Sequence, residues 1–333
     1  MTALGATAAI FGCLGPQLLP DEMAFFRDAD PFGFIIFARN VESPDQLYRL
    51  TSDLRAAVGR DALVLVDQEG GRVQRLRSPH WRDWSPPMDT ITAAPDLATA
   101  CHRMALRASL IAAELRAVGI DANCAPVADI ATDATHPFLR NRCYGTEAAA
   151  VIAIARAVSD AYLAGGVLPV IKHLPGHGRA TGDTHLDLPT VSTDAAELSA
   201  TDFAPFRALS DLPMAMTAHI VFSAFDSENP ATQSARMIDV IRSDIGFQGL
   251  LMTDDLNMQA LSGTLADRTA RSLAAGCDIA LHCKGDLAEM QSVAAAAGPM
   301  RADTQARAGR AIALRCPDPE IDIAAVEAEL AHA

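Results

Sequence analysis

The sequence has little positive charge: 27 lysines and arginines stand against 41 aspartates and glutamates, which gives a net charge of −14 at pH 7. Such a chain repels the phosphate backbone of nucleic acids and an anionic bilayer, so neither is expected as a partner. The seven cysteines are odd in number and form no Cys-x-x-Cys pair. This pattern favours free thiols in a reducing compartment over a disulfide framework.

A long uninterrupted hydrophobic run is also missing. The richest apolar stretch, residues 148–171, is interrupted by Arg156 and Asp160 and falls short of a membrane span. The small apolar segment 6–14 lacks the basic region of a secretory signal, because no basic residue precedes Arg27. We therefore expect a cytoplasmic protein that does not enter a membrane.

What the sequence does have is enough apolar material for a large core. Half of the 333 residues are hydrophobic, 20% are charged and the mean hydropathy is +0.14, which excludes a disordered or low-complexity chain. The length is compatible with two domains or with one large α/β unit. A pattern of secondary structure has to decide between them.

Short apolar runs alternate with longer Ala-, Leu-, Arg- and Glu-rich stretches, as in a parallel sheet with crossover helices. The eight runs are residues 8–14, 33–37, 62–66, 120–126, 168–172, 213–219, 249–252 and 277–282. The expected helices include residues 44–58, 97–118, 146–164, 194–209, 235–245, 267–275, 304–314 and 323–331. Eight units without a Ser/Gly-rich linker predict a single TIM-like (β/α)8 barrel over residues 1–333, with a helical tail from about residue 300. A doubly wound sheet is the alternative, but its dinucleotide fingerprint G-x-G-x-x-G is absent.

Polar residues follow seven of the eight runs, where the active site of such a barrel is built. They are Arg39 and Asn40; Asp67, Gln68, Glu69, Arg72 and Arg75; Asp129 with Arg140, Asn141 and Arg142; Lys172, His173, His177, Asp183 and His185; His219; Asp254 and Asp255; and His282 and Lys284. Each of them alone could be a solvated loop residue. Of the adjacent pair, Asp254 is expected to point along the barrel axis, and Asp255 to cap the next helix.

The segment 176–185 gathers three glycines, two histidines and an aspartate. Asp183 precedes His185 by two residues and can accept a proton from its imidazole, which fixes the tautomer and raises the basicity of the ring. A metal site is the alternative. We discount it because a helical HExxH-type pair is missing and Lys172 would place a positive charge beside the ion.

Taken together, these strings resemble family 3 glycoside hydrolases, in the branch of bacterial β-N-acetylglucosaminidases that recycle peptidoglycan. The resemblance rests on LVDQEGGRVQRL, NCAPVADI, RNRCYG, IKHLPGHGRATGDTHLDLP and LLMTDDLNM, in that order between residues 30 and 285. It departs from the family in Leu174, where Phe is usual, and in LHCKG, which lacks an expected Asn.

The resemblance implies a role for each matching residue. Asp254 would be the nucleophile that forms a covalent glycosyl-enzyme, and His185, paired with Asp183, the general acid/base. The residues implied to hold the sugar hydroxyls and N-acetyl group are Asp67, Arg75, Arg142, Lys172 and His173. The implied reaction is retaining hydrolysis of terminal β-linked N-acetylglucosamine, with a GlcNAc-anhydro-muramyl peptide as substrate and no cofactor.

Two other functions remain open at the level of the sequence. Lys172, on a barrel strand beside a histidine, could be the amine of a Schiff-base lyase or aldolase. A barrel that binds sugar but has lost catalysis is the other alternative, because fold does not guarantee function. The acidic composition is compatible with a monomer, and the sequence leaves the aglycone unspecified.

Overall fold

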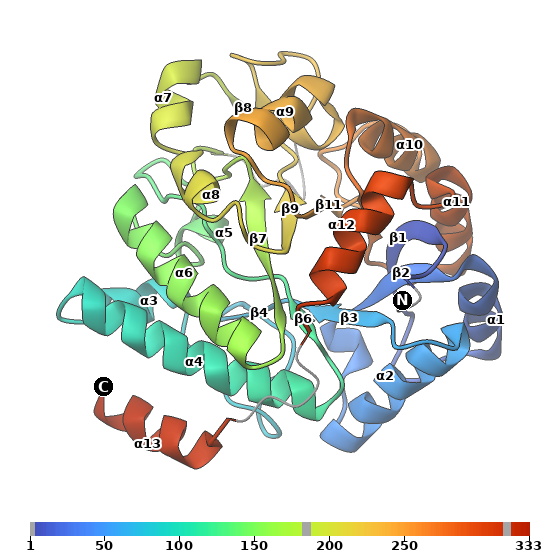
Figure 1. Cartoon of the computed structure of the whole chain (residues 1–333), viewed down its shortest axis with the longest axis horizontal. Coiled ribbons are helices and arrows are strands. Elements are labelled where there is room, and N and C mark those ends of the chain that lie inside the picture. Colours follow the sequence, from blue (N-terminus) through green and yellow to red (C-terminus); the bar gives the residue numbers. More distant parts are fainter. Residues whose placement is uncertain (1–3, 182–187, 316–320) are drawn as a thin grey trace.

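A closed barrel of eight parallel strands forms the centre of the molecule (Figure 1). The computed structural model describes residues 4–181, 188–315 and 321–333. Around the barrel the strands follow the order β1-β12-β11-β9-β7-β6-β3-β2. Their bounds are β1 Thr7–Gly12, β2 Pro31–Ile36, β3 Leu63–Val66, β6 Ala122–Asn123, β7 Leu168–Leu174, β9 Met214–Thr217, β11 Leu250–Asp255 and β12 Ile279–His282. The predicted (β/α)8 barrel is confirmed, and each predicted run contains or overlaps one barrel strand.

Helices surround this barrel (Figure 1). Their bounds are α1 Pro20–Ala29, α2 Pro44–Val58, α4 Leu97–Ala117, α6 Ala148–Ala164, α7 Ala195–Ala200, α8 Ala204–Ala208, α9 Ala235–Asp239, α10 Leu265–Ala275 and α11 Leu287–Ala297. Helix α2 shows why the boundaries were readable from sequence: the Ser43 side chain accepts from the Gln46 N–H at one end, and Gly59 takes a left-handed φ of 63° at the other.

Two expected helices differ from the prediction. The predicted helix 194–209 is divided into α7 and α8, because Pro205 has no N–H to donate to the carbonyl one turn earlier. The predicted helix 235–245 is α-helical only over α9 and continues as the π-helical segment η3, Val240–Asp244, where Ile245 N–H donates to Val240 O. The alternation of runs does not predict α1 or α11.

The βα loops carry small extra elements. Strands β4, Gln68–Gly70, and β5, Val73–Gln74, form an antiparallel pair directly after β3. A second pair joins β8, Thr190–Val191, to β10, Val221–Phe222. The short helices are α3 Pro87–Thr92, α5 Pro137–Arg140, and the 3-10 turns η1 Ala38–Asn40 and η2 Ala231–Gln233.

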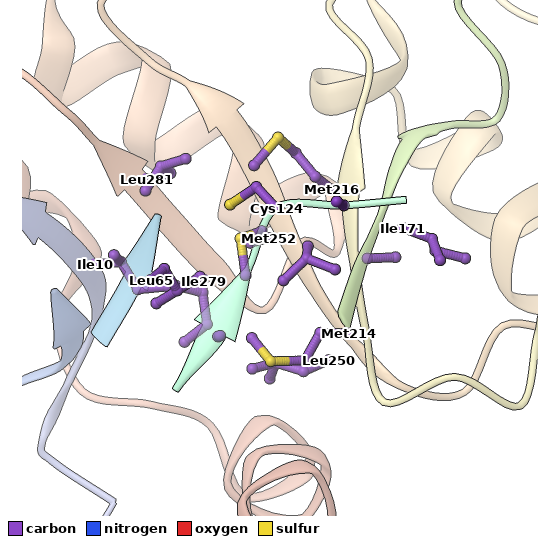
Figure 2. Close-up of a cluster of buried hydrophobic side chains, with 14 of the residues drawn as sticks. Ile10, Leu65, Cys124, Ile171, Met214, Met216, Leu250, Met252, Ile279 and Leu281 are labelled. Atoms are coloured by element: carbon purple, nitrogen blue, oxygen red, sulfur yellow. The ribbon is translucent and has the colours of Figure 1, made fainter. Parts of the chain in front are cut away.

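The barrel interior is filled by apolar side chains from opposite strands, which meet in the middle of the barrel (Figure 2). They are Ile10, Leu65, Cys124, Ile171, Met214, Met216, Leu250, Met252, Ile279 and Leu281. Side chains alternate between the two faces of a strand, so residues two positions further along point the same way. Two positions further toward the carboxyl end of its strand, each of three core residues is followed by a residue on the same face. Asp67 follows Leu65, Asp254 follows Met252 and Cys283 follows Leu281. The packed core therefore determines which polar side chains reach the barrel mouth.

Helix α12, Ala302–Ile312, lies at the opposite end of the barrel, beside the starts of β11 and β12. Helix α13, Ile323–His332, packs on the outside of α4 (Figure 1). Among residues 4–181, 188–315 and 321–333, no helix combines the length and the apolar composition needed to cross a bilayer.

Candidate active site

A cavity opens at the carboxyl ends of the barrel strands. It contains about 840 Å³ of empty space, its open mouth included, which is within the roughly 300–1,000 Å³ of small-molecule sites. Its charged and imidazole lining residues are Asp67, Arg75, His136, Arg142, Lys172, His173, His177, Asp254 and Asp255. Apolar residues, among them Phe37, Phe138 and Met258, complete the lining. A lining that combines charged and imidazole groups with apolar side chains suits a small molecule that has many hydrogen-bonding groups.

Carboxylates and cations that are buried or partly buried form a connected cluster at the cavity. Lys172 Nζ lies 2.8 Å from Asp67 Oδ1 and 2.7 Å from Glu69 Oε1. Arg75 Nη2 donates to the other Asp67 oxygen at 3.0 Å. Arg142 donates from Nε and Nη2 to the two oxygens of Glu69, at 2.8 and 2.9 Å. Such two-point pairing fixes the guanidinium plane as well as its position.

The charges of this cluster stabilise each other. Burial alone would raise the pKa of Asp67, but Lys172 and Arg75 outweigh it, so the pKa lies well below its usual range. Burial likewise opposes the charge of Lys172, yet Asp67 and Glu69 raise its pKa above the usual value. The ammonium group therefore stays protonated at neutral pH, and its donors are held in place before a ligand arrives.

A second carboxylate, Asp129, holds two histidines that line the cavity. Its Oδ2 lies 2.7 Å from His173 Nδ1, and its Oδ1 accepts from the His177 backbone N–H at 2.7 Å. The contact at Nδ1 directs His173 Nε2 away from Asp129; Nε2 lies 3.5 Å from Arg142 Nη2. Burial lowers the pKa of His177 to about 4, so that this ring is neutral at pH 7.

Asp254 lies near the end of β11 and lines the cavity. It is on the same face of the strand as Leu250 and Met252. Its Oδ1 accepts from the Asp255 N–H at 2.8 Å. Burial would raise the pKa of Asp254, but His219, His173, the Asp255 N–H and Lys172 together hold it below the usual value. This carboxylate is therefore ionised at neutral pH, the state that a nucleophile requires.

The expected helix-capping role of Asp255 is wrong. The next helix, α10, is capped by Thr264, whose side chain accepts from Asp267 N–H. Asp255 instead accepts from the N–H groups of Asn257, at 3.1 Å, and of Cys283, at 3.2 Å. The chain turns after β11 and does not enter a helix at once, so Asp255 closes a turn and ties it to the end of β12.

The structure brings six of the eight predicted site residues to one cavity: Asp67, Arg75, Arg142, Lys172, His173 and Asp254. The other two, Asp183 and His185, lie outside the described residues. Sequence reasoning assigned no role to Glu69 or Asp129, although both follow predicted strands. Their buried contacts with two cations and two histidines could not be read from sequence, because the partners belong to other strands and loops of the barrel.

The contacts of Lys172 argue against the Schiff-base alternative. An amine that attacks a carbonyl has to lose its proton, and such lysines lie in apolar or cationic surroundings that lower their pKa. Lys172 contacts two carboxylates, which have the opposite effect.

The family model described as "Glycosyl hydrolase family 3 N terminal domain" matches residues 26–310, which include every strand end that lines the cavity. The chain belongs to glycoside hydrolase family 3. The resemblance seen in the sequence is thereby confirmed, and the protein is a glycoside hydrolase enzyme.

Relatives named "Beta-hexosaminidase" match most of this family 3 chain. That of Methylococcus capsulatus is 37% identical over 279 residues, which are 82% of this chain and 82% of that protein. That of Bordetella avium is 35% identical over 292 residues, 83% of this chain and 80% of that protein.

Solved structures of similar proteins agree with this family assignment. NagZ from Neisseria gonorrhoeae in complex with N-trifluoroacetyl-D-glucosamine superposes with a TM-score of 0.87 at 28% identity, over 100% of this chain and 99% of that one. A family 3 β-N-acetylglucosaminidase from a Paenibacillus species gives a TM-score of 0.83 at 28% identity, over 96% of this chain and 62% of that one.

Proposed function

We propose that this glycoside hydrolase removes terminal β-linked N-acetylglucosamine with retention of configuration. The observation that carries the proposal is the ionised Asp254 carboxylate, which enters the cavity from β11 opposite a cluster of fixed donors and acceptors. The sugar preference is supported by relatives named β-hexosaminidases and by a similar structure that contains a glucosamine derivative.

In the first step of the proposed mechanism, Asp254 attacks the anomeric carbon. A bond forms between its carboxylate oxygen and C1 while the bond from C1 to the leaving oxygen breaks. His185, oriented by Asp183, gives its proton to the leaving oxygen. In the second step water attacks C1, its proton goes to His185, and the bond to Asp254 breaks. The roles of His185 and Asp183 are supported by the motif that contains them and by the suitability of imidazole for proton transfer near neutral pH.

The proposed role of the buried cluster is to hold the sugar. Lys172 and Arg142 donate hydrogen bonds only, whereas Asp67 accepts, so together they complement hydroxyl groups that do both. Their mutual contacts hold these groups in position before the sugar binds, which reduces the entropy lost on binding.

As natural substrate we propose a GlcNAc-anhydro-muramyl peptide of peptidoglycan recycling, taken by a monomer in the cytoplasm. The family resemblance supports the substrate. The compartment is supported by the cysteines, because all six within the described residues are free thiols.

The experiment that tests the function uses a slow fluorinated N-acetylglucosaminide and mass spectrometry. We expect a sugar adduct on the peptide that contains Asp254. With a chromogenic N-acetylglucosaminide, Asp254→Ala should lose roughly 10³-fold or more in kcat. An adduct on another residue, or an active Asp254→Ala variant, would refute the assignment.

Leaving groups test the acid/base role. His185→Ala should keep most activity on substrates whose leaving group needs no protonation and lose it on poor ones, because only the proton transfer is removed. Equal losses on both substrates would contradict the role of His185. Failure of borohydride to trap a carbonyl compound on Lys172 would complete the case against a lyase.

A further inference from the structure

The orientation of the Asp254 carboxylate depends on the backbone that follows it. Its Oδ1 accepts from the N–H of the next residue, Asp255, at 2.8 Å. This N–H moves with the turn over residues 254–258, so a shift of the turn rotates or displaces the carboxylate. Displacement of a reacting group by about 1 Å can cost on the order of 100-fold in rate.

The turn is tied to β12 on one side. Leu256 N–H donates to Leu281 O at 3.0 Å, and the Asp255 carboxylate accepts from Cys283 N–H at 3.2 Å. These contacts hold the first half of the turn against the neighbouring strand.

The Asn257 side chain ties the second half of the turn to helix α11. Its Nδ2 donates to Glu289 Oε2 at 3.0 Å. A carboxylate can only accept, so the amide nitrogen of Asn257 has to face it, and the amide orientation is fixed. The other oxygen of Glu289 accepts from Lys284 Nζ at 3.2 Å, a lysine whose side chain is 63% exposed. Glu289 thus joins the turn to a rigid helix.

A buried imidazole lies near the same Glu289 oxygen that accepts from Asn257. His282 Nε2 is 3.8 Å from Glu289 Oε2, and its side chain is fully buried. Lys284, Asp286 and Arg39 also act on it electrostatically, but burial is the main effect and lowers its pKa to about 4. A neutral ring at pH 7 does not draw the carboxylate away from Asn257.

We propose that Asn257 and Glu289 are positioning residues, which clasp the turn after β11 and so aim the Asp254 carboxylate at the anomeric carbon. This inference rests on the proposed function, in which Asp254 is the nucleophile. Neither residue lines the cavity, so their effect is on the placement of Asp254 and not on contact with the sugar.

Steady-state kinetics on a chromogenic N-acetylglucosaminide test the clasp. Asn257→Ala keeps its backbone N–H to Asp255 and loses only the contact with Glu289; Glu289→Ala loses the same contact from the other side. We expect each to lower kcat about tenfold with KM changed by less than about twofold, since positioning of a reacting group affects the transition state and not binding. The double variant should be no slower than the slower single variant.

Two further variants separate the hydrogen bond from other effects. Glu289→Gln keeps an acceptor oxygen for Asn257 and should restore most of the activity that Glu289→Ala loses. Lys284→Ala removes the other partner of Glu289 and should match the wild type within about twofold, as an exposed ion pair contributes little.

Unchanged kcat in Asn257→Ala and Glu289→Ala would overturn the inference, and so would equal losses in Glu289→Gln and Glu289→Ala. Asp254→Ala, measured in parallel, separates the two levels of the argument. If it is inactive while Asn257→Ala is fully active, the clasp is wrong and the proposed function stands. If Asp254→Ala is active, the proposed function itself fails.

Discussion

The two ends of the barrel both contain buried carboxylates, yet they use them differently. At the end of the barrel opposite the cavity, which we call the closed end, Asp278 precedes β12. Its Oδ2 accepts from Leu251 N–H at 3.0 Å and Arg242 Nη2 at 2.7 Å. Its Oδ1 accepts from Arg307 Nη1 at 2.8 Å and Thr304 Oγ1 at 2.9 Å. Four donors on α12, η3 and β11 thus converge on one side chain.

The same arrangement occurs across the barrel. Asp121 precedes β6, and its Oδ1 accepts from Val64 N–H on β3 at 2.8 Å. Its Oδ2 accepts from Arg55 Nη2 at 3.2 Å and Arg315 Nη1 at 2.6 Å. In both places a carboxylate joins the start of its own strand to the strand beside it, and the arginines come from the surrounding helices and the segment after α12.

At the open end, the carboxylates Asp67 and Glu69 share Lys172, and all three belong to loops or strand ends that border the cavity. The chemistry is the same at both ends, but the cations Arg75, Arg142 and Lys172 of the open end line the cavity that Asp254 enters. Buried ion pairs thus tie elements together at one end and present donors at the other. Variants at the two ends should therefore separate stability from activity.

The largest expected effect is on activity, at the open end. Lys172→Met removes the cation between Asp67 and Glu69 and leaves two carboxylates facing each other. Removing one partner of a buried pair costs about 3–5 kcal/mol, and the same magnitude in the transition state corresponds to a loss in kcat/KM of roughly 200- to 5,000-fold. Initial rates on a chromogenic N-acetylglucosaminide would measure it. A loss of less than tenfold would show that the shared cation does not hold the substrate.

The next effect is on stability, at the closed end. Asp278→Asn removes the charge on which four donors converge, and we expect the free energy of unfolding to fall by about 3 kcal/mol. Urea unfolding followed by circular dichroism would measure it. Asp303→Asn, which alters a largely exposed partner of Arg307, is the matched control and should cost less than about 1 kcal/mol. Below the unfolding transition, Asp278→Asn should keep kcat/KM within about twofold; a loss like that of Lys172→Met would abolish the distinction between the two ends.

The smallest effect concerns pH and sharpens the picture of the open end. Burial, with the adjacent Asp254 charge, raises the pKa of Asp255 to about 6, above the value of about 3.9 in an unfolded chain. The folded state therefore binds this proton more tightly than the unfolded chain does. The contribution of the protonated Asp255 to the free energy of unfolding is fully present below about pH 4 and is lost as pH rises through 6.

Asp255→Asn removes that titration. Relative to the wild type, the variant should be more stable at pH 7 than at pH 4, as judged by melting temperatures across this range. A difference between the two proteins that stays constant from pH 4 to pH 7 would contradict the raised pKa of Asp255.

Much of the barrel was readable from the sequence, because strands and helices depend on residues close together in the chain. Helix α2 has the bounds predicted for it, residues 44–58, and its ends are marked in the sequence by Ser43, Pro44 and Gly59. The start of helix α11 is also marked in the sequence: Asp286, with Glu289 three residues later, is a pattern typical of a helix N-terminus, and the Asp286 side chain accepts from Glu289 N–H. The division of the helix predicted at 194–209 was equally marked by Pro205.

By itself the sequence determined the eight strands and the polar residues that end seven of them. Side-chain alternation along a single strand places Asp67 on the same face as Leu65, and Asp254 on the same face as Met252. This inference does not depend on which strands lie next to each other. Only the tertiary structure decided which charges meet. Lys172 contacts Asp67 and Glu69 from more than 100 positions away, and Asp255 turned out to close a turn against β12 instead of capping a helix. The physical reason is that side-chain alternation is a property of the local backbone, whereas ion pairs and hydrogen bonds between strands depend on barrel closure, which brings distant residues to the same end.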